Sequence, residues 1–126
     1  MLARIQTGAG AAVWTGSTHL PSTDRDARAA ALKHLTAAAG GLDRPWVICG
    51  DFNPAPRTWI QRGQPIVVGP RLAWPTFPAR FPVRSLDYCI ASPGVRLRAR
   101  PLLAAGSDHL PLLARCRFAG PIGPAP

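Results

Sequence analysis

Glutamate is absent from this 126-residue sequence, so its six carboxylate side chains are all aspartates. Lysine occurs once, and fourteen arginines raise the formal net charge to +9. A surplus of cations favours phosphate-rich partners through steering and counterion release. An arginine-rich and alanine-rich composition also fits a GC-rich genome, so the charge alone leaves a nucleic-acid surface and a compositional bias equally open.

Long apolar runs and closely spaced cysteines are also lacking. No stretch reaches the ~18 apolar residues of a membrane span, and the first residues lack the basic segment and apolar core of a secretory signal. We therefore expect a cytoplasmic chain as written, or a secreted or membrane-anchored one if its true start lies upstream. Cys49, Cys89 and Cys116 lie in apolar runs without C-x-x-C spacing, which predicts buried free thiols.

Length predicts one domain, because 126 residues and 13.4 kDa suffice for a single core. We expect the domain to span residues 1–118. Residues 119–126 are rich in proline and glycine and are expected to form a disordered tail.

The N-terminal part of the chain predicts a strand, a helix and a second strand. Residues 11–19 form a β-prone run that ends at His19. An alanine-rich helix follows, which Ser22 or Thr23 can cap and a Gly-Gly pair ends. Residues 46–49 are continuously apolar, as in a strand buried on both faces. This order predicts a βαβ-like unit.

The rest of the chain predicts a long loop and three strands. Residues 54–82 hold seven prolines, so we expect an irregular loop with one short helix near Thr58–Arg62. Residues 86–91 and 95–100 are β-prone and are separated by Ser-Pro-Gly, which predicts a hairpin. A last strand is expected over residues 110–118.

The strand over residues 95–100 alternates apolar residues with Arg96, Arg98 and Arg100. Alternate side chains of a strand point to the same face. One face of this strand is therefore predicted to be basic and exposed to solvent.

Three of the six aspartates lie where predicted strands begin or end. Asp51 and Asn53 follow the buried run at 46–49, Asp87 opens the next strand, and Asp108 with His109 precedes the last one. Asp51 and Asn53 are two residues apart, so they share a face and point into one pocket if the strand continues past Gly-50. A strand end is where α/β folds place chemistry, although a single aspartate there is more often a turn former.

Four short segments in this order resemble motifs of the endonuclease/exonuclease/phosphatase superfamily, whose fold is DNase I-like. They are Thr-His-Leu at 18–20, Gly-Asp-Phe-Asn at 50–53, Arg-Ser-Leu-Asp-Tyr at 84–88 and Ser-Asp-His at 107–109. Residues 74–78, Trp-Pro-Thr-Phe-Pro, are similar to a further element of many bacterial members, but packing between prolines and aromatic rings explains them better. The match of several motifs in order is far more specific than any one of them.

The resemblance implies an α/β fold, a partial DNase I-like α/β sandwich. About one βα half of the four-layer fold is present, with a mostly antiparallel or mixed sheet. The missing first half would bring an Asn and a metal-binding Glu, and this sequence has no glutamate. A late assigned start, a truncated gene and a second polypeptide that completes the sandwich are three hypotheses. Half a sandwich would also expose a sheet face to a partner or to self-association.

The resemblance also implies a metal site for Mg²⁺ (or Mn²⁺). Asp108 would help to bind the ion, together with Asp51 and Asn53. Magnesium takes oxygen ligands and keeps several waters, and it neutralises charge on phosphate oxygens. Asp51 would in addition orient or deprotonate the attacking water.

The remaining implied roles concern the phosphate group. His109, His19 and Asn53 would contact it, and His19 could act as a general acid. Asp87 would accept a hydrogen bond from the other ring nitrogen of His109 and so fix its tautomer.

These roles predict a metal-dependent phosphoesterase that hydrolyses phosphodiester bonds in a nuclease-like reaction and is weakly active or inactive as this chain alone. Its substrate would be a phosphate ester, with DNA and a phospholipid head group as candidates. The alternative is a non-catalytic basic domain that binds nucleic acid or a protein partner through Arg96, Arg98 and Arg100.

Overall fold

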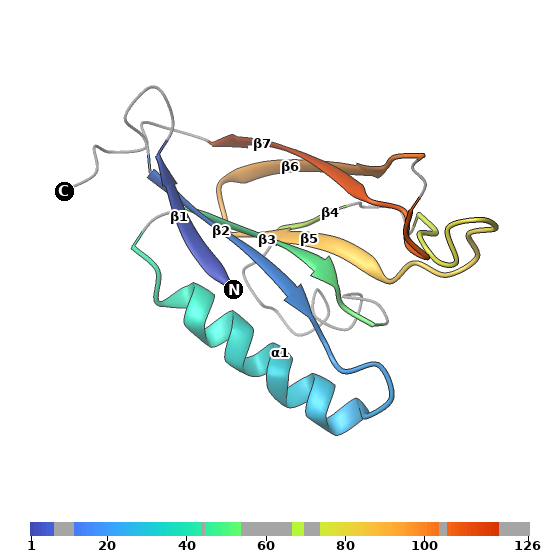
Figure 1. Ribbon diagram of the computed structural model, residues 1–126. Helices are drawn as coiled ribbons and strands as arrows, with labels where there is room; N and C mark the ends of the chain where they lie inside the picture. Colours follow the sequence, from blue (N-terminus) through green and yellow to red (C-terminus); the bar gives the residue numbers. More distant parts are fainter. Residues whose placement is uncertain (7–11, 44, 54–66, 70–73, 104–105, 119–126) are drawn as a thin grey trace.

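A computed structural model of the chain describes all residues except 7–11, 44, 54–66, 70–73, 104–105 and 119–126. The described part contains three layers: one helix, a five-stranded sheet and a two-stranded sheet (Figure 1). In chain order the elements are β1 (Leu2–Gln6), β2 (Ala12–His19), α1 (Arg25–Gly40), β3 (Trp46–Asp51), β4 (Val67–Gly69), β5 (Asp87–Ala91), β6 (Val95–Pro101) and β7 (Leu112–Phe118).

The larger sheet has the strand order β1-β2-β3-β5-β4. β2 and β3 are parallel and joined through α1, whereas the other neighbouring pairs are antiparallel. The expected βαβ unit and the mixed sheet are therefore confirmed. The short strand β4 was not predicted, because it lies within the proline-rich segment.

Helix α1 begins one residue after Asp24, not after Ser22 or Thr23 as predicted. A carboxylate oxygen of Asp24 accepts from the backbone N–H groups of Asp26 and Ala27, both at 2.9 Å. Asp24 therefore satisfies the N–H groups that a helix start leaves without partners. The apolar side of α1 packs on one face of the larger sheet, around a core that includes Trp46, Ile48, Phe52, Tyr88 and Ile90 (Figure 1).

The predicted hairpin between β5 and β6 is wrong. Both edges of β5 are occupied, by β3 on one side and β4 on the other, so β6 cannot pair with it. After the turn at Ser92 the chain instead crosses to the opposite face of the sheet, where β6 pairs with β7. Val95 and Leu97 are buried there, against residues such as Val47 and Cys89.

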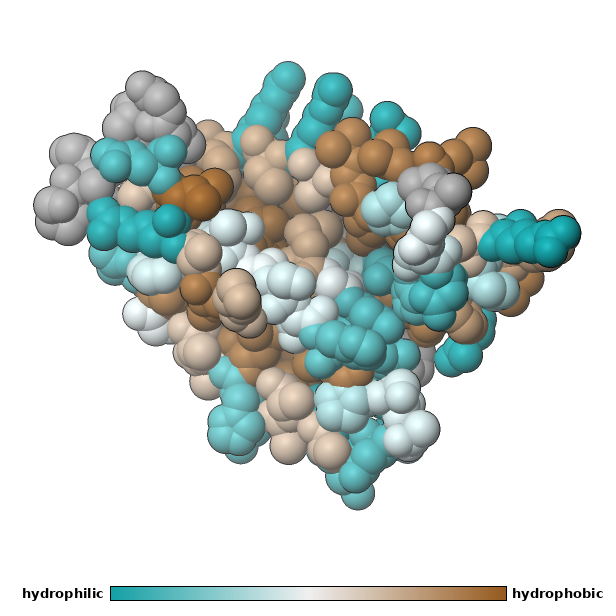
Figure 2. Space-filling model, viewed as in Figure 1, coloured by the Kyte–Doolittle hydropathy of each residue, from teal (hydrophilic) through white to brown (hydrophobic). Residues whose placement is uncertain are grey.

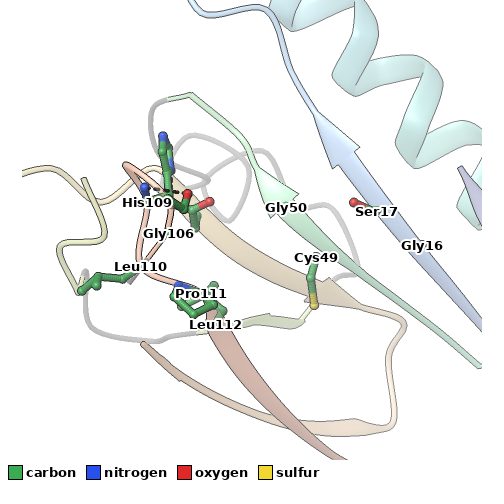
Figure 3. A pocket seen from close by; sticks show the side chains of 11 residues that line it. Gly16, Ser17, Cys49, Gly50, Gly106, His109, Leu110, Pro111 and Leu112 are labelled. Carbon is green, nitrogen blue, oxygen red and sulfur yellow. Dashed lines mark hydrogen bonds and ion pairs between the residues drawn. The ribbon is translucent and has the colours of Figure 1, made fainter. Parts of the chain in front are cut away.

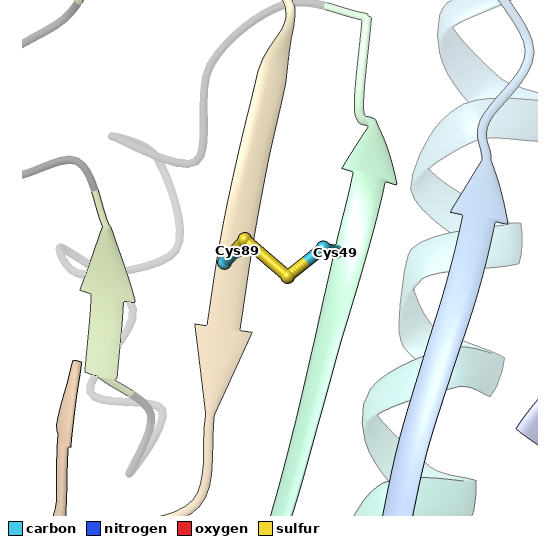
Figure 4. The surroundings of a disulfide bond; sticks show 2 residues. All are labelled: Cys49 and Cys89. Atoms are coloured by element: carbon cyan, nitrogen blue, oxygen red, sulfur yellow. A yellow bond between two sulfur atoms is a disulfide. The ribbon is translucent and has the colours of Figure 1, made fainter. Parts of the chain in front are cut away.

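Cys49 and Cys89 form a disulfide, which corrects the prediction of free thiols (Figure 4). They are direct register partners on β3 and β5, with Cα atoms 4.0 Å apart. Forty positions separate them in the sequence, so only the register of the two strands brings them together. Cys116 is free and half-buried, and burial raises the pKa of its thiol.

Two sequence-based predictions fall outside the described residues, namely the short helix near Thr58–Arg62 and the disordered tail at 119–126. Among the residues that are described, no helix combines the length and apolarity needed to cross a membrane.

Candidate functional site

Three neighbouring strands bring polar side chains to one edge of the larger sheet. The register pairs His19 on β2 with Asp51 on β3, and pairs Asp51 in turn with Asp87 on β5. These residues, far apart in the sequence, are thus cross-strand neighbours. The edge therefore gathers polar side chains that the sequence placed at strand ends.

Gly50 makes the close approach of β3 and β2 possible. Its φ of 155° lies in a region that side chains rarely adopt, and a Cβ there would collide with the backbone carbonyl of Thr18. Only glycine fits this position without moving β2. The glycine of the Gly-Asp-Phe-Asn motif therefore sets the position of Asp51.

The Asp51 carboxylate lies between two histidines. Its Oδ2 atom is 3.6 Å from Nε2 of His19 and 3.9 Å from Nε2 of His109. Both distances are longer than the donor–acceptor distance of a good hydrogen bond, and the His19 side chain is 74% exposed. A polar atom of a ligand can therefore enter between these groups without breaking a short bond.

His109 is held by Asp87, as predicted. Its Nδ1 atom lies 2.8 Å from Oδ2 of Asp87. With Nδ1 engaged, Nε2 is the ring nitrogen that faces Asp51. Partial burial lowers the pKa of His109, but the hydrogen bond to Asp87 and the charges of Asp87, Asp51 and Asp108 raise it more, so the pKa lies above its ordinary value of about 6.5.

The loop before β7 delivers Asp108 and His109. The His109 N–H donates to Oγ of Ser107 at 3.1 Å, and the Asp108 carbonyl accepts from the Ala79 N–H at 2.7 Å. The Asp108 side chain is exposed and adds to the negative charge around His109. Ser107, absent from the predicted set, shapes this turn and could have been noticed as part of the Ser-Asp-His motif.

Thr76 and Phe77 support the site, whereas the sequence predicted only packing between prolines and aromatic rings for the Trp-Pro-Thr-Phe-Pro segment. Thr76 is fully buried, and its Oγ1 accepts from the N–H groups of Leu86 and Asp87, each at 3.4 Å. Its carbonyl accepts from the Leu110 N–H at 2.8 Å. One residue thereby ties the strand of Asp87 to the loop of His109, whose ring lies 4.9 Å from that of Phe77.

Asn53 does not share a strand face with Asp51, which corrects the sequence-based geometry. β3 ends at Asp51, and Asn53 adopts a left-handed backbone with a φ of 32°. Its N–H donates to Oδ1 of Asp51 at 2.9 Å, and its buried amide donates to the Leu20 carbonyl at 3.0 Å. Asn53 therefore orients Asp51 and ties the end of β2 to the turn, while Phe52 enters the core.

A cleft of about 420 Å³ opens beside this cluster (Figure 3). It is lined by Gly16, Ser17, Cys49, Gly50 and Asp87 from the sheet, and by residues 106, 107 and 109–112 of the loop that leads into β7. Asp51 and His19 lie outside its lining. The Asp87–His109 pair therefore lines the cleft and also lies beside Asp51.

The oxygen donors of the cluster fit a hard divalent cation in part. In the described part of the chain, no three His, Cys, Asp or Glu side chains converge as a complete metal site. Magnesium, however, commonly uses only one or two protein carboxylates and completes its shell with waters and substrate oxygens. Asp51 and Asp108 can supply such carboxylates, whereas the amide nitrogen of Asn53 is engaged with Leu20 and leaves only its oxygen.

Comparison with known proteins places these features in a family. Residues 3–109 match the model of the Endonuclease/Exonuclease/phosphatase family. No curated protein sequence shows significant similarity to the chain.

Solved structures share the fold. A humanized TDP2 of D. rerio is 15% identical with a TM-score of 0.69. The alignment covers 93% of this chain and 59% of the TDP2 chain. The human Nocturnin catalytic domain with bound sulfate is 20% identical with a TM-score of 0.61, and the alignment covers 92% of this chain and 51% of that domain. A mannosyl-6-phosphatase of Bacteroides thetaiotaomicron is 15% identical with a TM-score of 0.58, and the alignment covers 85% of this chain and 51% of the phosphatase chain. The chain thus spans about half the length of these proteins, and the partial α/β sandwich is confirmed.

Proposed function

The chain belongs to the endonuclease/exonuclease/phosphatase family, and we propose that its Asp51, Asp87 and His109 are half of the active site of a Mg²⁺-dependent phosphodiesterase. Members of this family hydrolyse phosphate esters. One observation carries the proposal: strand register places Asp51 beside Asp87, and Asp87 holds His109 at 2.8 Å so that its Nε2 faces Asp51.

Each residue of the cluster has a distinct task in hydrolysis. Asp51 accepts a proton from, or orients, the attacking water, because its Oδ2 faces the open edge. His109, protonated more readily than an ordinary histidine, donates from Nε2 to a phosphate oxygen. Exposed His19 is free to turn toward the same phosphate. A bound Mg²⁺, held by Asp51 and Asp108 with Asn53 as a further oxygen donor, would neutralise the phosphate oxygens.

The substrate we propose is a phosphodiester, with nucleic acid favoured over a phospholipid head group by the surplus of arginine.

Ile5 on β1 is 48% exposed, and it lies in a part of the larger sheet that β6 and β7 do not cover. We propose that the remaining half of the sandwich, in a longer chain or another polypeptide, packs there. Turnover by the chain alone is then expected to be slow.

Hydrolysis of bis-p-nitrophenyl phosphate tests the metal dependence. We expect turnover above background with Mg²⁺ or Mn²⁺, its loss with EDTA, and its recovery when metal is restored. The His109→Ala variant should not respond to metal, whereas His34→Ala, altered on the exposed side of α1, should match wild type. Salt-sensitive DNA binding without metal-dependent turnover would instead favour the non-catalytic basic domain.

A further inference from the structure

The two-stranded sheet carries five arginines on its outer face. The register sets Arg96 opposite Arg117 and Arg98 opposite Arg115, with Arg100 opposite Leu113. All five arginines are exposed, whereas the alternate residues of both strands face the larger sheet. Hydrophilic side chains project from the side of the molecule where β6 and β7 lie (Figure 2). We call these five residues the arginine face.

Among the described residues, no negative charge balances the arginine face. Neither β6 nor β7 contains an aspartate, and within the described residues no carboxylate forms an ion pair with any of the five arginines. Like charges directly opposite each other on paired strands destabilise the pairing. Two such pairs stand side by side here, so a polyanion that binds the arginine face would relieve repulsion that the fold otherwise retains.

A compositional bias does not explain this placement by itself. Every arginine of β6 and β7 lies on the outer face, and the register in addition sets two of them directly opposite two others, where the alternation of each strand alone would not place them. The inner positions are filled by residues such as Val95, Leu97 and Ala114. Solvent exposure alone would accept any polar residue at the outer positions.

We propose that the arginine face binds the phosphate backbone of duplex DNA, as a docking surface distinct from the catalytic cluster. Alternate residues on a strand repeat about every 6.8 Å, and duplex DNA presents a dense array of phosphates, so neighbouring arginines can contact separate phosphates. Guanidinium groups bind phosphate in a bidentate manner.

Two features favour a duplex of B-form DNA over other polyanions. The aromatic residue of these strands, Phe118, packs toward the larger sheet, so the arginine face offers no ring on which single-stranded bases could stack. A two-stranded ribbon fits the wide major groove of B-form DNA, whereas the A-form major groove is too narrow. Arg100 and Leu113 lie at the end of the ribbon that leads to His109, so bound DNA would run toward the site.

Fluorescence anisotropy with a duplex of arbitrary sequence, in EDTA to prevent hydrolysis, tests this proposal independently of catalysis. Five phosphate contacts predict a slope of about −4.5 for log K against log salt, or about 500-fold weaker binding in 200 mM than in 50 mM salt. The double variant Arg98→Gln/Arg115→Gln should reduce the slope by about 1.8. Its melting temperature should stay equal or rise, because the variant removes an opposed pair.

The matched control is Arg4→Gln/Arg25→Gln, which makes the same change in net charge on β1 and α1. Both of its side chains are exposed. The proposal requires wild-type DNA affinity within about twofold for this control. Equal losses in both double variants would show that net charge alone drives binding and would overturn the proposal. Tighter binding of wild type to phosphatidylserine vesicles than to the duplex would overturn it in favour of a membrane.

Discussion

Replacement of Asp51 by asparagine should abolish metal-dependent hydrolysis while leaving the fold intact. The amide keeps the size of the side chain and can still accept from the Asn53 N–H, which the carboxylate does at 2.9 Å. It can neither take a proton from water nor provide negative charge for a metal. We expect the metal-dependent rate to fall by about 10²–10⁴-fold, or to background where that is reached first. Initial rates at saturating Mg²⁺ measure the effect.

Asp26→Asn is the control for Asp51→Asn, because it removes the same charge from an exposed position in the first turn of α1. Its rate should equal that of wild type. Circular dichroism and thermal melting of both variants separate a chemical effect from unfolding. A metal-dependent rate in Asp51→Asn within threefold of wild type, in a folded protein, would exclude Asp51 from the reaction.

Replacement of Asp87 by asparagine should change how His109 binds protons. The hydrogen bond and charge of Asp87 raise the His109 pKa against the opposing effect of burial. Without that carboxylate, burial weighs more and the pKa should fall. We expect turnover to drop by about 10–100-fold, as on loss of a carboxylate behind a functional histidine, and the loss of activity at high pH to begin at a lower pH than in wild type.

Folding stability should also decrease as the pH rises through the pKa of His109. Because the folded pKa of His109 exceeds its unfolded value of about 6.5, its protonation stabilises the fold fully below pH ~6.5, and this contribution is lost as pH rises through the folded pKa. The contribution should decrease in Asp87→Asn, because only the charges of Asp51 and Asp108 then oppose the effect of burial. Urea unfolding of the metal-free proteins across this range measures it, with His34→Gln as a control that keeps the wild-type profile. An unchanged pH profile in Asp87→Asn would show that this pair does not govern His109.

The local sequence predicted α1 and five of the strands but missed β1 and β4, and it did not predict how the strands pair. A run such as 95–100 shows period-two alternation, so it predicts a strand with a basic face whatever it pairs with. Its pairing partner depends on β4, a three-residue strand that pairs with the edge of β5 not used by β3. The disulfide was missed for a similar reason, because Cys49 and Cys89 meet only through the register of β3 and β5.

At the site, the motifs identified the chemical groups while their geometry required backbone detail. The Asp87–His109 pairing follows from the resemblance and is present at 2.8 Å. The position of Asn53 does not follow from alternation, because the strand ends at Asp51 and the chain turns left-handed. Buried Thr76 was not recognised as a support, since its bonds join segments that are far apart in the sequence and meet only in the fold.

The central claim is that the cluster at the ends of β2, β3 and β5 is the phosphate site of this chain. Nitrogen NMR of the imidazole side chains, on addition of phosphate diester and Mg²⁺ to the wild-type chain, tests it without requiring turnover. Each of the three histidines has a defined place: His19 and His109 flank Asp51, and His34 is exposed on α1. The account predicts saturable shifts for His19 and His109 and none for His34. Shifts confined to His34, or absent from all three at saturating ligand, would contradict it.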